Sequence, residues 1–215
     1  MTKTNPKLLK FFTDQFKPGN VGLIGTGDFI GKAIREAQRK LTPDGKASQW
    51  SHAFILGDLR WDRRGPKQAR TQSPYLFESD LKVNLLKPQL RNGAQENWVG
   101  KWCSPDVETA AVIDFGLTDP ERDDVRASAL QLVEEQVLYP VQGLLGTWWA
   151  IVTDRQWQKN PLEDPHAMYC SSFVRYCYQE ADRDFMGSAV ALSNTAPEHI
   201  AQAGQKTGAM TVFKA

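Results

Sequence analysis

The spacing of apolar residues along the chain predicts a series of separate helices. In the segment 7–16, Leu and Phe residues recur at the interval of an amphipathic helix, and Pro6 suits its first turn. Helices are also predicted over 29–41, where Asp28 is placed to cap the first turn, and over roughly 121–138. Along the second helix one stripe carries the apolar residues Phe29, Ile30, Ala33, Ile34, Ala37 and Leu41.

Compact apolar runs between these helices predict strands. Residues 51–59 and 109–115 are short, apolar and bounded by polar turns, as buried strands are, and residues 75–86 alternate loosely as one or two strands. A last strand is predicted over 209–214 and a short helix at about 148–152. Separate helices and strands without strict βαβ alternation are typical of the α+β class.

Composition indicates a folded protein and excludes several functional classes. The 215 residues are 41% hydrophobic and include seven Trp, which is enough for one sizeable core and favours a single domain. Formal net charge is +1, and the densest basic run, 60–64 (RWDRR), is short and mixed, so nucleic-acid binding is not expected. The three cysteines form no CxxC pair, which argues against a disulfide framework and a zinc ribbon.

No targeting signal is apparent in the sequence. The first 20 residues contain no continuous apolar region and no small-residue cleavage site, and no apolar run approaches 18 residues. We therefore expect synthesis in the cytoplasm without a secretory signal, no transmembrane segment, and any export by a signal-independent route.

Cys170 is the strongest candidate for a nucleophile. It opens a predicted helix over 170–181, in which the buried face is formed by Cys170, Phe173, Val174, Cys177 and Ala181. A cysteine in a first turn feels the partial positive charge of unpaired N–H groups, which stabilises a thiolate. The same backbone N–H groups, near Cys170 and Ser171, suit an oxyanion. The alternative is a small buried hydrophobe, which is the role we expect for Cys177.

Three histidines are candidates for the base. His52 opens the apolar strand 51–59, where a buried imidazole needs a polar partner such as a thiol. His166 lies four residues before Cys170 in a loop and is the weaker alternative. His199 follows Pro197 near a predicted helix start and is expected to be structural.

A cysteine–histidine pair usually needs a polar residue that orients the imidazole. Glu78, in the strand that follows His52, is the best candidate, and Asp28 is the rival orienter. No cofactor is indicated. A metal site built from His166 with Glu163 or Asp164 would rest on neighbouring loop residues alone, so no metal is expected.

Four segments, taken in order, resemble the circularly permuted branch of the NlpC/P60 superfamily, particularly the YiiX-like cysteine hydrolases. They are 27–30 (GDFI), 50–57 (WSHAFILG), 76–79 (LFES) and 169–174 (YCSSFV), with a weaker match at 196–200 (APEHI). Ordinary papain-like enzymes place the cysteine before the histidine, whereas here the histidine segment comes first, as the permutation implies. Residues 87–108 form an insert without a counterpart in that pattern.

The resemblance implies a permuted papain-like (NlpC/P60) fold over residues 1–215, with a central antiparallel sheet packed against helices and the helix within 1–20 as an extension. It implies Cys170 as nucleophile and His52 as base. Trp50, Ser51 and Tyr169, which flank them in the matching segments, are expected to contact substrate.

Three functions are consistent with these residues. The first is a peptidoglycan amidase or endopeptidase, since cell-wall peptides are the commonest substrate that the resemblance implies. The missing signal then suits a phage product, or an antibacterial effector and toxin with a secretion machinery or immunity protein as partner. The second is a lipid- or acyl-directed thiol hydrolase or acyltransferase, and the third is a catalytically silent binding module. Apolar residues upstream of the cysteine could line an acyl site: Leu144, Leu145, Trp148, Trp149 and Trp157.

Overall fold

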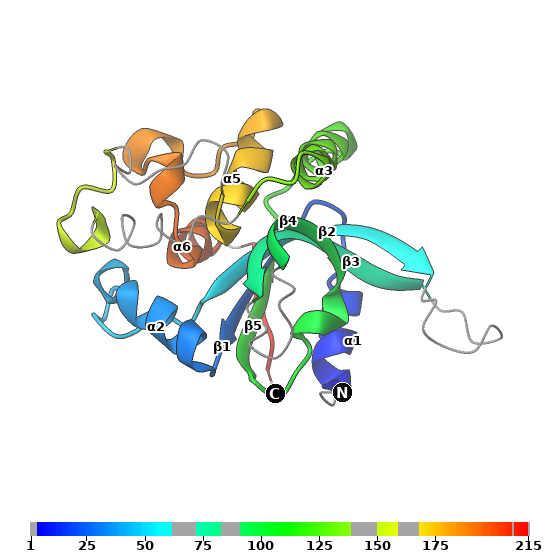
Figure 1. The fold of residues 1–215 in the computed structure, drawn as a ribbon, viewed down its shortest axis with the longest axis horizontal. Coiled ribbons are helices and arrows are strands. Elements are labelled where there is room, and N and C mark those ends of the chain that lie inside the picture. Colours follow the sequence, from blue (N-terminus) through cyan, green and yellow to red (C-terminus); the bar gives the residue numbers. More distant parts are fainter. Residues whose placement is uncertain are drawn as a thin grey trace.

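The computed structural model has an α+β architecture built on one six-stranded antiparallel sheet (Figure 1). It describes residues 4–61, 72–82, 91–138, 150–158, 168–207 and 209–214. The strands lie in the order β4-β3-β2-β1-β5-β6, and every neighbouring pair is antiparallel. Their bounds are β1 Val21–Thr26, β2 His52–Trp61, β3 Gln72–Lys82, β4 Arg91–Trp98, β5 Val107–Ile113 and β6 Met210–Val212.

Two of these strands are absent from the sequence-based prediction. β1 lies between β2 and β5 at the centre of the sheet, and all six of its residues are buried. Gly22 is needed there because a Cβ atom would lie 2.1 Å from the ring of Phe54 on β2. β4 forms the edge next to β3, within the insert that has no counterpart in the family pattern.

Three helices cover one face of the sheet and form the main core (Figure 1). They are α3 (Asp119–Glu134), α5 (Cys170–Glu180) and α6 (Pro197–Thr207). α3 starts before the predicted position because Thr118 and Glu121 form a capping box at its N-terminus. α5 begins at Cys170 as predicted, and all five residues expected on its buried face are buried. The sheet residues of this core include Val21, Leu23, Ala53, Ile55, Phe77, Ala111 and Ile113.

The opposite face of the sheet is covered by α1 (Pro6–Asp14) and the short 3-10 helix η2 (Val99–Trp102). Leu8 and Phe12 of α1 are buried against alternate residues of the same strands, among them Ile24, Phe54, Leu56, Leu76 and Val112. Because side chains alternate between the two faces of a strand, each central strand contributes to both cores.

The second predicted helix forms but does not bury its apolar stripe. α2 (Phe29–Ala37) is followed by the 3-10 turn η1 (Arg39–Leu41), and Gly31 is its only buried residue. Phe29 and Ile30 are 88% and 59% exposed. Other short helices are η3 (Gly187–Ala189) and η4 (Leu192–Asn194), and residues 150–152 are helical. Within the described parts of the chain, no helix has both the length and the apolar composition that a membrane span needs.

Candidate active site

His52 is the first residue of β2 and lies next to Ile24 of β1. Alternation along the strand places its side chain on the same face as Phe54, away from the main core. The imidazole is 7% exposed and its ring centroid lies 4.7 Å from that of Trp102. A buried imidazole in this position requires polar partners on the neighbouring strand and helix.

Glu78, on the adjacent strand β3, is the first of these partners. Its Oε2 lies 2.7 Å from Nε2 of His52 and accepts a second bond from the indole N–H of Trp102 at 2.8 Å. Its Oε1 accepts bonds from Asn97 at 2.7 Å and from Lys101 at 2.6 Å. The carboxylate is fully buried, and each of its oxygens has two donors. It can therefore act as an anchor but has little capacity to accept a further proton.

Three of the four donors come from β4 and η2, for which the sequence suggested no role. Lys101 lies between two carboxylates, because its Nζ is also 2.6 Å from Oδ2 of Asp80. The ammonium lies 4.7 Å from the centroid of the Trp102 ring. Burial opposes the charge on Lys101, but the Coulombic attraction of Glu78 and Asp80 outweighs it and raises the pKa of the lysine.

Cys170 is the second partner of His52. It is the first residue of α5 and is 4% exposed. Its side chain interacts electrostatically with His52, and this interaction raises the pKa of the imidazole. Because Nε2 of His52 is already bonded to Glu78, the nitrogen available to Cys170 is Nδ1. The structure thus brings together the three residues that the sequence analysis selected, from α5, β2 and β3.

Two hydroxyl groups fix the start of α5. Ser79 of β3 donates to the carbonyl oxygen of Met168, in the segment that leads into the helix. Ser171 donates to the carbonyl oxygen of Thr195 at 2.6 Å. These bonds locate Cys170 relative to the sheet.

The charges in the site support one another. Burial, the largest single effect on His52, disfavours the charged imidazole, but the interactions with Cys170 and Glu78 outweigh it and raise its pKa to about 10. Burial also disfavours a charged Glu78, but the bonds and charges of His52 and Lys101 hold its pKa well below the usual range. The attraction between Cys170 and His52 exists only when a thiolate faces an imidazolium.

The first turn of α5 presents backbone N–H groups beside the thiol. The first N–H groups of a helix have no partner within the helix. The N-cap residue, Tyr169, has an extended backbone and its side chain makes no capping bond. The N–H groups near Cys170 and Ser171 therefore have the position that the sequence analysis expected of an oxyanion site.

The other predicted residues lie around this group rather than in it. Asp28 caps α2 by accepting a 2.9 Å bond from the backbone N–H of Gly31. Of the two candidate orienters, Glu78 is the one that bonds to Nε2 of His52. Trp50 is buried in the main core, and Ser51 is buried with its Oγ bonded to the N–H of Thr26. Tyr169 is also buried. Contact of Trp50, Ser51 and Tyr169 with substrate stays a prediction.

The remaining cysteines and histidines have different surroundings. Burial raises the pKa of the Cys103 thiol to about 12 and that of Cys177 beyond it. His199 accepts a bond from the N–H of Ala196 and is 2.7 Å from Oε1 of Gln156, a structural role. His166, Glu163 and Asp164, like the proposed acyl-lining residues Leu144, Leu145, Trp148 and Trp149, lie outside the described residues. Trp157 is described and is 64% exposed.

Two further observations concern ligands. Among the residues that the structure describes, no three His, Cys, Asp or Glu side chains are grouped as metal ligands.

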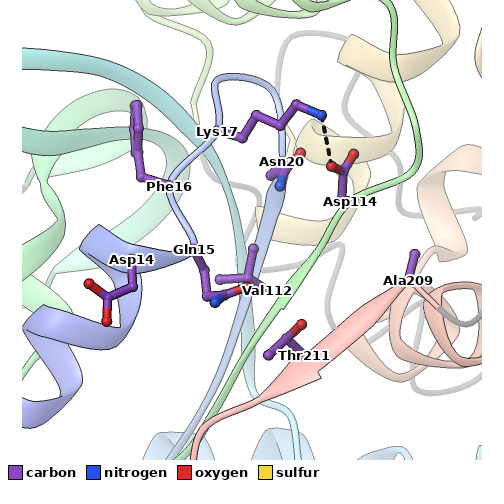
Figure 2. Close-up of a pocket in the computed structure, with 9 residues that line it drawn as sticks. All are labelled: Asp14, Gln15, Phe16, Lys17, Asn20, Val112, Asp114, Ala209 and Thr211. Carbon is purple, nitrogen blue, oxygen red and sulfur yellow. Dashed lines mark hydrogen bonds and ion pairs between the residues drawn. The ribbon is translucent and has the colours of Figure 1, made fainter.

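A polar hollow lies near the start of β1, at the opposite end of that strand from Ile24, the residue that pairs with His52 (Figure 2). In it, Nζ of Lys17 lies 3.0 Å from Oδ2 of Asp114. Its lining residues are Asp14, Gln15, Phe16, Lys17, Asn20, Val112, Asp114, Ala209 and Thr211.

Comparison with protein-family models found none that matches the chain, and comparison with curated proteins found no significant match.

Proposed function

We propose that the protein is a cysteine hydrolase with a circularly permuted papain-like fold that cleaves amide bonds. Cys170 is the nucleophile, His52 the base and Glu78 the residue that positions His52. The observation that carries this proposal is the 2.7 Å bond between His52 and Glu78, together with the electrostatic interaction of Cys170 with the same imidazole. A thiol, an imidazole and an orienting carboxylate in this order are what nucleophilic cysteine catalysis requires.

The arrangement of elements supports the proposed fold. A thiol at the N-terminus of a helix meets a histidine at the start of a neighbouring antiparallel strand. The histidine strand and the carboxylate strand precede the cysteine helix in the chain, the order that characterises the permuted branch.

In the first half of the reaction, the Cys170 thiolate attacks the carbonyl carbon of the substrate and a C–S bond forms. The electron pair of the C=O bond moves to oxygen, where backbone N–H groups in the first turn of α5 stabilise it. The imidazolium of His52 gives its Nδ1 proton to the amide nitrogen as the C–N bond breaks. An amine leaves and a thioester on Cys170 remains.

In the second half, neutral His52 takes a proton from water at Nδ1 while the water oxygen attacks the thioester carbonyl. The C–S bond breaks, the carboxylic acid leaves, and the thiolate–imidazolium pair is restored. Glu78 accepts the Nε2–H of His52 throughout, which fixes the ring and stabilises its positive charge.

Peptidoglycan peptides are the proposed substrate, and an antibacterial effector is the proposed biological setting. The support for both is the resemblance of the segments around His52 and Cys170 to the YiiX-like hydrolases. An acyl ester is the alternative substrate.

The test is incubation of the purified protein with peptidoglycan sacculi, with mass spectrometry of the released fragments, in parallel with acyl esters. We expect new amine and carboxyl termini from peptidoglycan, reduced to background in Cys170→Ala and His52→Ala. Cys177→Ala, in the same helix but away from its N-terminus, should keep the activity. Turnover of acyl esters alone would transfer the proposal to the second substrate class. No turnover of either, together with failure of iodoacetamide to label Cys170, would overturn the hydrolase proposal.

A further inference from the structure

Lys101 is a largely buried cation that lies between two carboxylates next to the candidate site. Its Nζ lies 2.6 Å from Oε1 of Glu78 and 2.6 Å from Oδ2 of Asp80, and its side chain is only 19% exposed. Burying an ammonium is unfavourable unless the charge is paired. The fold places this charge two residues beyond His52 in a line of interacting residues: Cys170, His52, Glu78, Lys101.

We propose that Lys101 is a positioning residue that acts through Glu78: it holds that carboxylate in the orientation that accepts the Nε2–H of His52 and places a positive charge beside the site. This inference rests on the proposed hydrolase site, and it adds a residue from the insert for which the family pattern offered no role.

The hydrogen bonds of Glu78 show how Lys101 fixes the orientation of this carboxylate. Lys101 and Asn97 fill the positions at Oε1, which leaves Oε2 for His52 and Trp102. Without Lys101 the buried carboxylate would lose a permanently charged partner, and a shared proton or a rotated carboxylate would become more favourable. Either change would weaken the bond that fixes the imidazole.

Changes of charge at Lys101 and at Asp80 should act on the Cys170–His52 pair with opposite sign. Among the residues that the structure describes, the charged groups linked to the pair are Glu78 and Asp80 of β3 and Lys101 of η2: Glu78 acts on His52, and Lys101 acts on Glu78 and is itself paired with Asp80. Removing a nearby positive charge makes protonation easier at every group, and removing a negative charge makes it harder. Lys101→Met and Asp80→Asn should therefore shift the titration of the pair in opposite directions, although both break the same ion pair.

Two measurements that need no substrate test whether Lys101 and Asp80 act on the Cys170–His52 pair. The first is the pH dependence of alkylation of Cys170 by iodoacetamide, and the second is the NMR titration of the His52 ring. In Lys101→Met the half-maximal point of alkylation should move to higher pH by about one unit or more, and in Asp80→Asn it should move to lower pH. The His52 titration should move in the same directions.

The controls separate charge from structural damage. Lys101→Arg keeps the charge and should restore the wild-type profile. Lys17→Met removes a lysine that is paired with Asp114 at the other end of β1, and should leave the profile unchanged (Figure 2). If Lys101→Met does not fold, the downward shift in Asp80→Asn and the unchanged profile in Lys101→Arg still test the inference.

Unchanged titration of His52 and Cys170 in both Lys101→Met and Asp80→Asn would overturn the role of Lys101 and leave the hydrolase proposal standing. Shifts of the same sign in the two variants would also overturn it, since they would indicate general loosening. Opposite shifts in a protein that hydrolyses neither substrate would support the role of Lys101 and count against the proposed function.

Discussion

The hydroxyl group of Ser79 donates a hydrogen bond to the carbonyl oxygen of Met168, two residues before Cys170. Ser79 directly follows Glu78 on β3, and adjacent residues of a strand point to opposite faces. One face of β3 therefore holds the imidazole through Glu78, while the other holds the segment that leads into α5. This dipeptide couples the positions of the base and the nucleophile.

Ser79→Ala should impair catalysis more than stability. The lost hydrogen bond should lower the free energy of unfolding by about 1 kcal/mol. A small displacement of the nucleophile should lower kcat by about tenfold or more. Urea unfolding measures the loss of stability. Kinetics on the substrate that the cleavage assay identifies measure the loss of kcat. In Thr207→Val, which loses a bond to the carbonyl oxygen of Gly204 at the end of α6, stability should fall and kcat should not. Equal effects on kcat in the two variants would contradict the coupling.

Glu78→Gln should destabilise the protein strongly. The variant leaves the Lys101 ammonium without one of its two carboxylates and places an amide donor among four donors. Breaking a buried ion pair in this way costs about 3–5 kcal/mol, which chemical denaturation can measure. The pKa of His52 should fall as well, because it loses the attraction of Glu78.

Glu96→Gln is the matched control for this variant. Glu96 pairs with Arg60 on the edge of the sheet, where the arginine is 47% exposed. The loss there should be about 1 kcal/mol or less. A loss of that size in Glu78→Gln would show that the carboxylate is not needed as a buried anchor.

His52 and His199 should give the protein opposite pH dependences. The pKa of His52 is raised from 6.5 to about 10, so its stabilising effect is complete below pH 6.5 and is lost as the pH rises towards 10. Burial, with a smaller effect of Arg175, lowers the pKa of His199 to about 4. The unfolded chain therefore binds this proton first, and stability is lost as the pH falls from 6.5 towards 4.

Replacement of His199 tests the acidic half of this prediction. Between pH 6.5 and 4, the decrease in the free energy of unfolding should be about 2–3 kcal/mol smaller in His199→Asn than in the wild type. Urea unfolding across this range gives the comparison. Parallel curves for the two proteins would show that His199 is not the group responsible.

Gly22→Ala should destabilise the centre of the sheet. The added Cβ would lie 2.1 Å from the Phe54 ring, an overlap that costs about 1–3 kcal/mol or more. Phe54→Leu removes that ring, so the double variant should be less destabilised than the sum of the two single ones. Thermal or urea unfolding of the four proteins completes the cycle, and strict additivity would rule out the clash as the cause.

The sequence predicted the elements whose signal is local. The α+β class is confirmed, and so are β2 and β5, marked by compact apolar runs, and the start of α5 at Cys170, marked by a helical period; the loose alternation over 75–86 corresponds to β3 (Gln72–Lys82). β1 was missed because Gly22 and Gly25 weaken the pattern of a strand. Their presence depends on close approach to Phe54 and to the carbonyl oxygen of Gln49, contacts that only the folded sheet creates.

The site residues that were not predicted reach Glu78 through contacts between segments that are far apart in the sequence. β4 is polar because it is an edge strand, so its period gave no signal. Asn97, Lys101 and Trp102 reach Glu78 only because β4 pairs with β3 and η2 then folds over it. A lysine between two tryptophans in the run NWVGKW was the available hint, since a cation in an apolar stretch needs an anion nearby.

The fourfold bonding of Glu78 constrains how this sequence can change over evolutionary time. Loss of a single donor removes one of the two partners of a buried carboxylate oxygen, and loss of the acid removes one of the two carboxylates that pair with the Lys101 ammonium. We therefore expect Asn97, Lys101 and Trp102 to be inherited as a block in any lineage that keeps the acid, and to drift freely once the acid is gone. Covariation across this block and the acid, rather than similarity along the whole chain, is the signature by which distant relatives of this protein can be recognised.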